Sequence, residues 1–308
     1  MARSLSGVPP AFLLFSASGL WGGATVLNKA LLVTISPVLL LVIQLLASTV
    51  ALLAAVFWVG IALPRGRVLM AAIALGVLNP GISYTFSLMG LDRISASVSS
   101  LLWATEPFLI LGLAWLVLRE PITLKVVATI AVGFVGVICV SGLLSDPASG
   151  ETDLVGVGFL LLAVLMCAVY TVFSRKLGDT VDPLSLVAVQ QAAGLVWAVL
   201  LLAWSSNSGI AASISAVPPV EFVYAAISGQ LYFATAYWLY LSALGRVSAA
   251  LAGGSFNIIP LVTIAVAFVF LGERLSGMQA LGAALILLSA SALFWLTSGA
   301  PDPQRQTG

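Results

Sequence analysis

Few side chains in this sequence could do acid, base or metal chemistry. Its 308 residues include 12 Lys and Arg, 11 Asp and Glu, two Cys and no His. Without His, the chain lacks the commonest general base, metal ligand and pH switch. Cys139 and Cys167 lie inside apolar runs, where structural thiols are expected, and they form no metal-binding pattern with the carboxylates. We therefore expect no metal site, no cofactor and no enzymatic activity.

One carboxylate, Glu106, stands in the middle of an apolar run. In a continuous helix, Ser99, Trp103 and Glu106 fall at positions i, i+4 and i+7 and share one face. Pro107 follows and cannot donate a backbone hydrogen bond, which frees carbonyl groups beside the carboxylate. Glu106 is expected either to bind an ammonium group or carry a proton, or to be a structural carboxyl paired with its neighbours.

Lys29 is the second charge that falls inside an apolar run. A Lys near a helix end can extend its ammonium group into the interface between membrane and water. The alternatives are an ion pair with Glu106 and a contact with the carboxylate of a bound solute.

The elements that position these side chains follow from the composition. Hydrophobic residues make up 61% of the chain and charged residues 7%, whereas an ordinary soluble domain has about 25% charged residues. This balance excludes a soluble protein and a disordered one, and no concentrated basic surface offers itself to nucleic acid. The chain instead divides into ten apolar segments, each near the roughly 20 residues that cross a bilayer. They are 10–33, 38–61, 68–91, 95–118, 122–143, 154–175, 184–204, 219–244, 247–271 and 276–298. The sequence thus predicts an all-α membrane protein with ten transmembrane helices.

Lys and Arg are distributed unevenly between the two sides of such a bundle. Side A, where the N-terminus lies, holds nine of the twelve, and side B holds Lys29, Arg93 and Arg274. Because cytoplasmic loops are enriched in Lys and Arg, side A is predicted to be cytoplasmic, with both termini there.

Polar and aromatic side chains within the spans are unfavourable toward lipid and are expected to turn inward. The candidates for an internal cavity are Trp21, Asn28, Lys29, Asn79, Ser83, Tyr84, Ser99, Trp103, Glu106, Tyr170, Tyr232, Tyr237, Phe256 and Asn257. Such a lining is aromatic, hydrogen-bonding and almost uncharged, which suits neutral or zwitterionic solutes with an apolar part. Any one ring can instead belong to the core or to an interfacial belt. The expected belt residues are Trp58, Trp197, Trp204 and Trp295.

The sequence also repeats itself. At an offset of 153, Gly76, Tyr84, Arg93, Pro107 and Glu120 fall on Gly229, Tyr237, Arg246, Pro260 and Glu273. Earlier in each half the offset is 146, and there Lys29, Pro37 and Gln44 fall on Arg175, Pro183 and Gln190. Because each half has an odd number of helices, the halves enter the membrane from opposite sides, as in the inverted repeats of transporters. The predicted units are helices 1–5 (residues 1–145), helices 6–10 (residues 150–298) and a polar cytoplasmic tail (residues 299–308).

Two matched stretches carry a family resemblance. Residues 260–282 read PLVTIAVAFVFLGERLSGMQALG, residues 107–123 read PFLILGLAWLVLREPIT, and Trp21-Gly22 followed by Lys29 and Pro37 opens the first half. The chain resembles the drug/metabolite transporter superfamily in its ten-helix, two-repeat EamA-type branch. Within that branch it is most similar to bacterial exporters of amino acids and related metabolites, including the aromatic amino acid exporter. One departure is Ile259, which stands where the first half has Glu106.

The resemblance implies export by alternating access in the inner membrane of a bacterial cell. It also implies a central cavity lined by helices 1, 3, 4, 6, 8 and 9, with helices 5 and 10 at the periphery. The expected partners are the lipid bilayer and a small amino acid-like solute, and the sequence makes no prediction of an oligomeric state. Efflux of hydrophobic drugs or cations, or export of another small metabolite, is the alternative. A membrane enzyme and a channel are disfavoured, because neither a cluster of catalytic groups nor a ring of charges is visible.

Two further expectations concern the backbone. Pro107 and Pro260 are predicted to be matched hinges in helices 4 and 9. Gly19 and Gly23 form a small-xxx-small pair that is predicted to let two helices approach closely.

Overall fold

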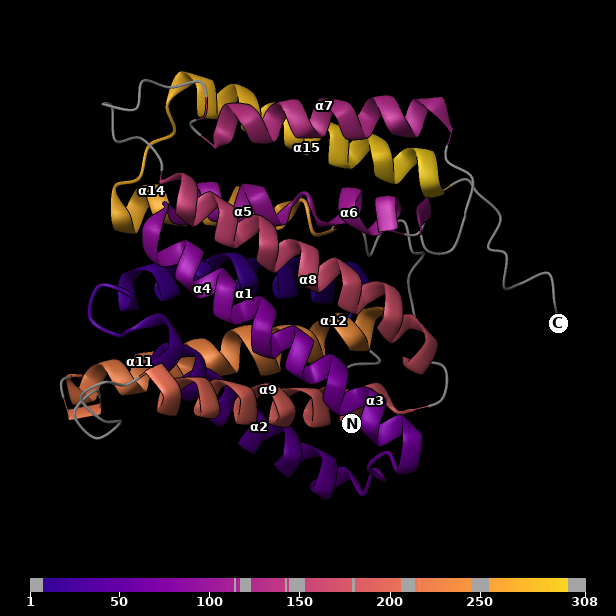
Figure 1. Cartoon of the computed structure of the whole chain (residues 1–308), viewed down its shortest axis with the longest axis vertical. Coiled ribbons are helices and arrows are strands. Elements are labelled where there is room, and N and C mark those ends of the chain that lie inside the picture. Colours follow the sequence, from indigo (N-terminus) through magenta and orange to yellow (C-terminus); the bar gives the residue numbers. More distant parts are fainter. Residues whose placement is uncertain are drawn as a thin grey trace, which may run out of the picture.

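The computed structural model describes residues 8–113, 115–116, 123–141, 143, 153–178, 181–205, 214–215, 217–244 and 255–298. Within these ranges every regular element is a helix. The elements are α1 (Pro10–Leu31), α2 (Pro37–Val59), α3 (Gly66–Gly76), η2 (Val77–Ile82), α4 (Ser83–Arg93), α5 (Ala96–Trp103), α6 (Glu106–Leu113), α7 (Leu124–Val140), α8 (Leu154–Gly178), α9 (Pro183–Ser205), α11 (Pro219–Gly229), η5 (Gln230–Thr235), α12 (Ala236–Leu244), α14 (Ile258–Leu271) and α15 (Gly277–Ser298). Figure 1 shows them stacked as a bundle, with most helix axes running across the view.

Seven helical stretches are long and apolar enough to cross a membrane. They are Pro10–Leu31, Pro37–Val59, Gly66–Arg93, Ala96–Leu113, Leu154–Ser174, Pro183–Ser205 and Gly277–Leu296. Leu124–Val140 and Ile258–Leu271 are shorter apolar helices. In addition, α11, η5 and α12 run without a gap from Pro219 to Leu244. The described ranges therefore hold ten helical segments at the ten predicted places, and the prediction of an all-α membrane protein is confirmed.

Proline and glycine set the ends of several helices. Pro10, Pro37 and Pro219 stand at the first helical positions, where a backbone N–H group has no partner within the helix. Gly60 and Gly272 follow α2 and α14 in the left-handed conformation, with φ of 75° and 67°. A residue without a Cβ adopts that conformation easily and stops the helix. These residues limit each apolar run to about the thickness of a bilayer.

The two halves of the chain repeat helix by helix. α3 and α11 begin and end 153 residues apart, as do η2 and η5, whereas α2 and α9 begin and end 146 residues apart. A close contact repeats as well. A Cβ atom on Gly76 would lie 2.3 Å from the Gln190 carbonyl oxygen, and one on Gly229 would lie 2.5 Å from the Gln44 carbonyl oxygen. The predicted inverted repeat is therefore present in the fold, and its equivalent helices α2 and α9 pack against each other.

Other helices of the two halves also interleave. α1 packs against α12 and α14 of the second half, while α8 packs against α4 and α6 of the first half. α7 and α15 pack mainly against each other at one edge, at the top of Figure 1. The predicted unit limits at 145 and 150 and the tail at 299–308 lie outside the described residues and stay a prediction.

The fourth membrane segment is interrupted. α5 ends at Trp103, Ala104 and Thr105 form a turn, and α6 begins at Glu106. In the second half, a turn at 256–257 directly precedes α14. Each of these two turns lies shortly before a proline, Pro107 or Pro260, whose nitrogen carries no hydrogen to donate to the preceding turn.

The expectation that Gly19 and Gly23 form a close helix contact is wrong. No described atom lies within 4 Å of a Cβ atom built on either residue. Gly22, between them, is the contact point, because a Cβ atom there would lie 2.9 Å from the Ile259 carbonyl oxygen. One residue turns a helix by about 100°, so the face of α1 that meets α14 passes through Gly22 and misses both neighbours.

The expected tryptophan belt is only partly right. Trp58, Trp204 and Trp295 are 90%, 89% and 76% exposed, as expected for rings at the protein surface. Trp197 instead packs against Gly81, where a Cβ atom would lie 3.1 Å from its ring. The missing side chain at Gly81 makes room for this indole within the protein.

Candidate functional site

Aromatic rings from both halves meet near the centre of the bundle. The ring of Tyr84 stacks on Trp103, with centroids 5.7 Å apart, and meets Tyr232 edge to face at 5.6 Å. Such ring pairs contribute about 0.5–1.5 kcal/mol each beyond the area that they bury. Phe233 also packs on Tyr84, at 4.9 Å, although the sequence analysis did not single it out. The structure therefore brings together three of the predicted rings and one that resembled an ordinary core residue.

A second group of rings forms around Trp21 on α1. Trp21 stacks on Phe256 at 5.7 Å and meets the edge of Tyr237 at 5.3 Å. Tyr240, one turn beyond Tyr237 on α12, contacts both Trp21 and Phe256. The i, i+3 spacing of Tyr237 and Tyr240 is a sequence signal that could have identified Tyr240.

Backbone irregularities hold some of these rings in place. The π-helical stretches η2 and η5 occupy equivalent positions in the two repeats. A π-turn shifts the backbone hydrogen-bond pattern and leaves carbonyl groups available to side chains. In η5, the carbonyl of Tyr232 accepts a hydrogen bond from Trp21 Nε1 at 3.0 Å, and the carbonyl of Phe233 accepts one from Gln191 Nε2 at 2.7 Å. The indole of Trp21 is therefore oriented by backbone of the other half.

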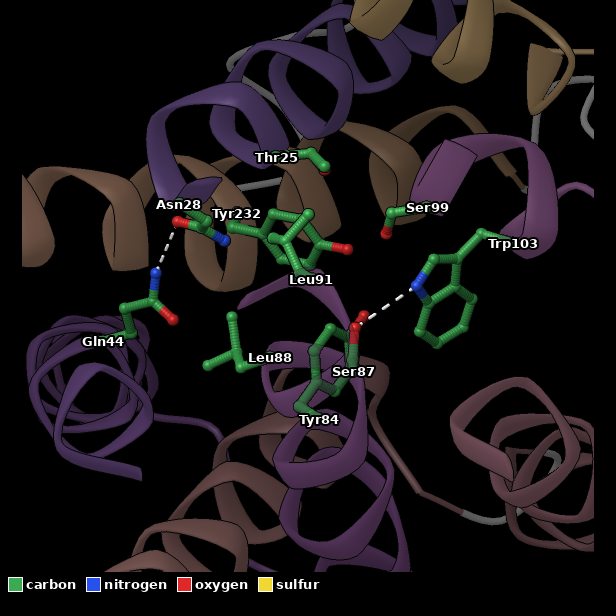
Figure 2. Close-up of a pocket in the computed structure, with 10 residues that line it drawn as sticks. All are labelled: Thr25, Asn28, Gln44, Tyr84, Ser87, Leu88, Leu91, Ser99, Trp103 and Tyr232. Atoms are coloured by element: carbon green, nitrogen blue, oxygen red, sulfur yellow. Dashed lines mark hydrogen bonds between the residues drawn. The ribbon is translucent and has the colours of Figure 1, made fainter. Parts of the chain in front are cut away.

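A small cavity of about 10 Å³ lies beside Tyr84 and Trp103 (Figure 2). Its lining residues are Thr25, Asn28, Gln44, Tyr84, Ser87, Leu88, Leu91, Ser99, Trp103 and Tyr232. This volume is about what a single water molecule needs. Five of the predicted cavity residues line it: Asn28, Tyr84, Ser99, Trp103 and Tyr232. In this structure the cavity has room for about one water molecule.

A buried polar network forms one wall of this cavity. Asn28 Oδ1 accepts hydrogen bonds from Gln44 Nε2, at 2.7 Å, and from the Ser228 hydroxyl. Gln44 Oε1 is buried and has no hydrogen-bond partner in the described part of the chain. At the equivalent position of the other repeat, Gln190 Oε1 accepts a hydrogen bond from the Tyr170 hydroxyl at 2.8 Å, while its Nε2 is buried and unpartnered within the described ranges. A buried polar atom without a partner lowers stability by about 1–3 kcal/mol. Gln44 Oε1 can therefore accept a hydrogen bond from water or a bound solute, and Gln190 Nε2 can donate one.

Gln44 and Gln190 were absent from the predicted site. The signal was available, because both residues are polar, lie in long apolar helices and match at the repeat offset. Two buried glutamines related by the repeat indicate a role at the centre of the fold.

Glu106 lies apart from the small cavity. It is the first residue of α6, and its Oε1 accepts a hydrogen bond from Thr171 Oγ1 of α8 at 3.2 Å. Cys167, one turn earlier on α8, lies near this carboxyl group. The predicted common face with Ser99 and Trp103 is not kept, because the turn at 104–105 separates Glu106 from the helix that carries them. Of these three residues, Ser99 and Trp103 line the cavity and Glu106 does not.

Lys29 does not pair with Glu106 in this structure. Its Nζ donates to the carbonyl oxygens of Leu91 and Asp92, both at 2.9 Å, at the C-terminal end of α4. The unpaired carbonyl groups there form the negative end of the helix dipole, which attracts a cation. Lys29 thus joins α1 to α4 at the side-B end of the bundle.

Three other predicted residues lie outside the small cavity, and two of them make hydrogen bonds within the fold. Ser83 donates to the carbonyl of Ala163 at 2.9 Å, and Asn257 Nδ2 donates to Ser291 Oγ at 3.0 Å. Asn79, within η2, is buried, and its Oδ1 lacks a partner among the described residues. The hydrogen bonds of Ser83 and Asn257 thus join neighbouring helices. Likewise, the described residues contain no group of three His, Cys, Asp or Glu that could hold a metal ion.

A carboxylate from the second half caps a helix of the first half at side B. Glu273 Oε1 accepts from the backbone N–H of Ala96 at 2.8 Å, and Oε2 accepts from the backbone N–H and the hydroxyl of Ser97 at 2.9 and 2.7 Å. A negative charge at a helix N-terminus is favourable because it meets free N–H groups and the positive end of the dipole. Glu273 therefore fastens the loop after α14 to the start of α5. In a second contact between the halves, the Thr34 hydroxyl donates a hydrogen bond to the carboxylate of Glu221.

These features define a class of protein. Two interleaved helical repeats, broken or π-helical membrane segments and polar groups buried at their interface are typical of secondary transporters. The sequence model of the EamA-like transporter family matches residues 8–142 and, a second time, residues 154–295. The chain belongs to this family, and it is a membrane transporter of small solutes.

Relatives from three bacteria cover between 70% and 93% of this chain. The uncharacterized transporter YvbV of Bacillus subtilis is 26% identical over 295 residues, which is 93% of this chain and 92% of that protein. Protein PecM of Dickeya dadantii is 24% identical and covers 91% of this chain and 92% of its own length. The S-adenosylmethionine/S-adenosylhomocysteine transporter of Chlamydia trachomatis is 24% identical over 217 residues, which is 70% of this chain and 67% of that protein. A solved crystal structure, 19% identical, superimposes with a TM-score of 0.65 over 94% of this chain and 97% of its own, which shows a shared fold.

Proposed function

We propose that this protein exports small neutral or zwitterionic organic solutes with an apolar part, and that amino acids with aromatic or other hydrophobic side chains are its main substrates. The observation that carries the proposal is the cavity wall, where Gln44 Oε1, without a partner among the described residues, lies on the same wall as the rings of Tyr84 and Trp103. The rings offer flat apolar contact, and the amide oxygen accepts a hydrogen bond from a substrate ammonium or amide group.

Export would proceed by alternating access. The present cavity admits about one water, so a substrate enters only after the surrounding helices separate toward one side. Pro107 and Pro260 would serve as matched hinges, since a turn lies just before each of them. Movement at such breaks changes few hydrogen bonds, which makes them the places where a helix bends most easily.

Glu106 would bind the coupling proton or the substrate ammonium group. Its hydrogen-bond partner is the uncharged Thr171, and no Lys or Arg pairs with it in the described part of the chain. A carboxyl group without a counter-ion inside a membrane protein is available to take up a proton or a cation.

The test is transport by the purified protein in liposomes. Efflux of labelled phenylalanine, tyrosine, tryptophan and leucine would be followed with and without a pH gradient. The proposal predicts saturable flux for at least one of them, competition among them, and loss of flux in Tyr84→Ala. An absence of saturable flux for every amino acid would reject amino acids as substrates.

A second candidate function is efflux of hydrophobic cations. It is favoured by charge. Lys29 is bound to the end of α4, and no Lys or Arg lines the cavity among the described residues, whereas aromatic rings attract cations. The Chlamydia relative, whose name includes S-adenosylmethionine, carries a substrate with a positive charge. Flux of a labelled lipophilic quaternary ammonium ion, unaffected by excess phenylalanine, would favour this function over amino acid export.

We also propose the inner membrane of a bacterial cell as the location, with side A cytoplasmic. The support is the excess of Lys and Arg on side A, nine against three. A cysteine introduced in the C-terminal tail should react with an impermeant maleimide only after the cells are opened. The two five-helix units at 1–145 and 150–298 and the cytoplasmic tail at 299–308 belong to the same proposal.

A further inference from the structure

A groove opens on the surface of the protein at side B, between α14, the start of α5 and the loop that follows α14. Its volume is about 360 Å³. Ile264, Ala265, Phe268 and Leu275 supply most of its wall, and Phe268 is 52% exposed. The neighbouring Val269 and Phe270 on α14 are 70% and 77% exposed. A helix that is so apolar on its outer face lies against lipid, so the groove faces the bilayer.

A positive charge stands at the mouth of this groove. The guanidinium of Arg274 lies 5.6 Å from the centre of the Phe268 ring, and its side chain is exposed. No carboxylate pairs with it in the described ranges, where the one ion pair is Arg93–Asp153. Glu273, its neighbour in sequence, directs its carboxylate to the start of α5. Arg274 therefore offers an unneutralised charge at the level where a membrane helix ends.

We propose that this groove binds an anionic phospholipid, with the phosphate on Arg274 and one acyl chain along Ile264, Ala265 and Phe268. A guanidinium matches phosphate geometry through paired hydrogen bonds and loses less hydration than an ammonium group. The end of α14 places this charge at the height of lipid headgroups, and the apolar wall continues from it toward the membrane interior.

The bound lipid has a consequence for the conformation of the transporter. Ser97 and Glu273 also line the groove, and these residues form the hydrogen bonds that fasten the second half to α5 at side B. A lipid in the groove lies against this contact and covers it from the bilayer side. It therefore stabilises the conformation that is closed at side B.

The test compares lipids on the purified full-length protein in neutral detergent. Thermal unfolding would be followed while phosphatidylglycerol, phosphatidylcholine or inorganic phosphate is added, and retained lipid would be counted by native mass spectrometry. We expect a saturable rise in Tm and one retained phosphatidylglycerol for the unmodified protein. Arg274→Gln should need about tenfold more phosphatidylglycerol for the same rise, and Arg274→Lys should be intermediate.

Two further variants separate the headgroup from the chain. Ala265→Trp fills the groove and leaves Arg274 in place, so it should also lose the phosphatidylglycerol effect. Arg67→Gln removes an exposed Arg at the start of α3, away from the groove, and should behave like the unmodified protein. Equal effects of phosphatidylcholine and phosphatidylglycerol, the same stabilisation by inorganic phosphate alone, equal losses in Arg67→Gln and Arg274→Gln, or a dimer that covers the groove would each overturn the proposal.

Discussion

The contact of Gly76 with α9 allows a sharp test of the fold. A Cβ atom at this position would lie 2.3 Å from the carbonyl oxygen and 2.6 Å from the Cα atom of Gln190, both of them backbone atoms. An ordinary contact needs about 1 Å more, so Gly76→Ala must push α3 and α9 apart. Overpacking of this kind costs typically about 1–3 kcal/mol, and a backbone clash belongs at the upper end. Alanine has the higher helix propensity, which offsets about 1 kcal/mol of this cost. The net loss in the free energy of unfolding is therefore about 2 kcal/mol.

Gly229, the repeat equivalent of Gly76, allows the same test in the second half of the chain. Gly229→Ala meets the backbone of Gln44 at 2.5 Å and should lose a similar amount. In contrast, Gly19→Ala and Gly23→Ala add a methyl group where no described atom lies within 4 Å, and they should be neutral or more stable. Thermal unfolding in detergent, monitored by tryptophan fluorescence, should show Tm lowered by roughly 4–8 °C in the first pair. If Gly76→Ala or Gly229→Ala melted at or above the unmodified protein, the assigned helix crossing would be wrong.

Three other predictions concern the charged groups. Glu106→Gln keeps an oxygen that can accept the hydrogen bond from Thr171, but its amide cannot take up a proton. Transport by this variant should therefore lose its dependence on pH. An unchanged rate and pH profile in liposomes would exclude Glu106 as the proton carrier. Glu273→Gln loses the charge and one of the acceptors that cap α5, which should weaken the side-B contact by about 2 kcal/mol, or roughly 30-fold. A cysteine at position 99 should then react faster with an impermeant maleimide, whereas Asp182→Asn, which removes a carboxylate cap local to α9, should leave the rate unchanged. The hydrogen bond from Arg93 holds the pKa of Asp153 below its usual 3.8, so this pair stabilises the protein above that pH and is lost as the pH falls through the lowered value. Arg93→Gln should accordingly lower Tm at pH 7, and the difference should shrink below about pH 4; an equal difference at pH 3 would contradict this assignment.

The arrangement of helices could be predicted from the sequence because two strong signals set it. Apolar length determines where a chain can cross a bilayer, and polar residues such as Gln44 and Gln190 that match at one offset reveal the repeat. The ring cluster followed from the same rule, since Tyr84 and Trp103 had to turn away from lipid.

The rest of the site depended on backbone features that residue types do not encode. The turn at 104–105 moves Glu106 off the face of Ser99, although an unbroken helix would have aligned them. The π-helical stretches make carbonyl groups available, and the carbonyl that Trp21 reaches belongs to the other half of the chain. Lys29 has several possible partners within the length of its side chain, and only the assembled fold selects the end of α4.

The narrow cavity beside Tyr84 also affects how affinity can be measured. A space of about 10 Å³ cannot hold an amino acid, so the conformation described here does not bind substrate. Under the proposed alternating access, only the fraction of molecules that has opened binds substrate. The apparent dissociation constant then equals the intrinsic one divided by that fraction. If one molecule in a hundred were open, a site with micromolar intrinsic affinity would measure at about 0.1 mM. A weakened side-B contact, as in Glu273→Gln, would then tighten apparent binding from that side without changing any residue that touches the substrate.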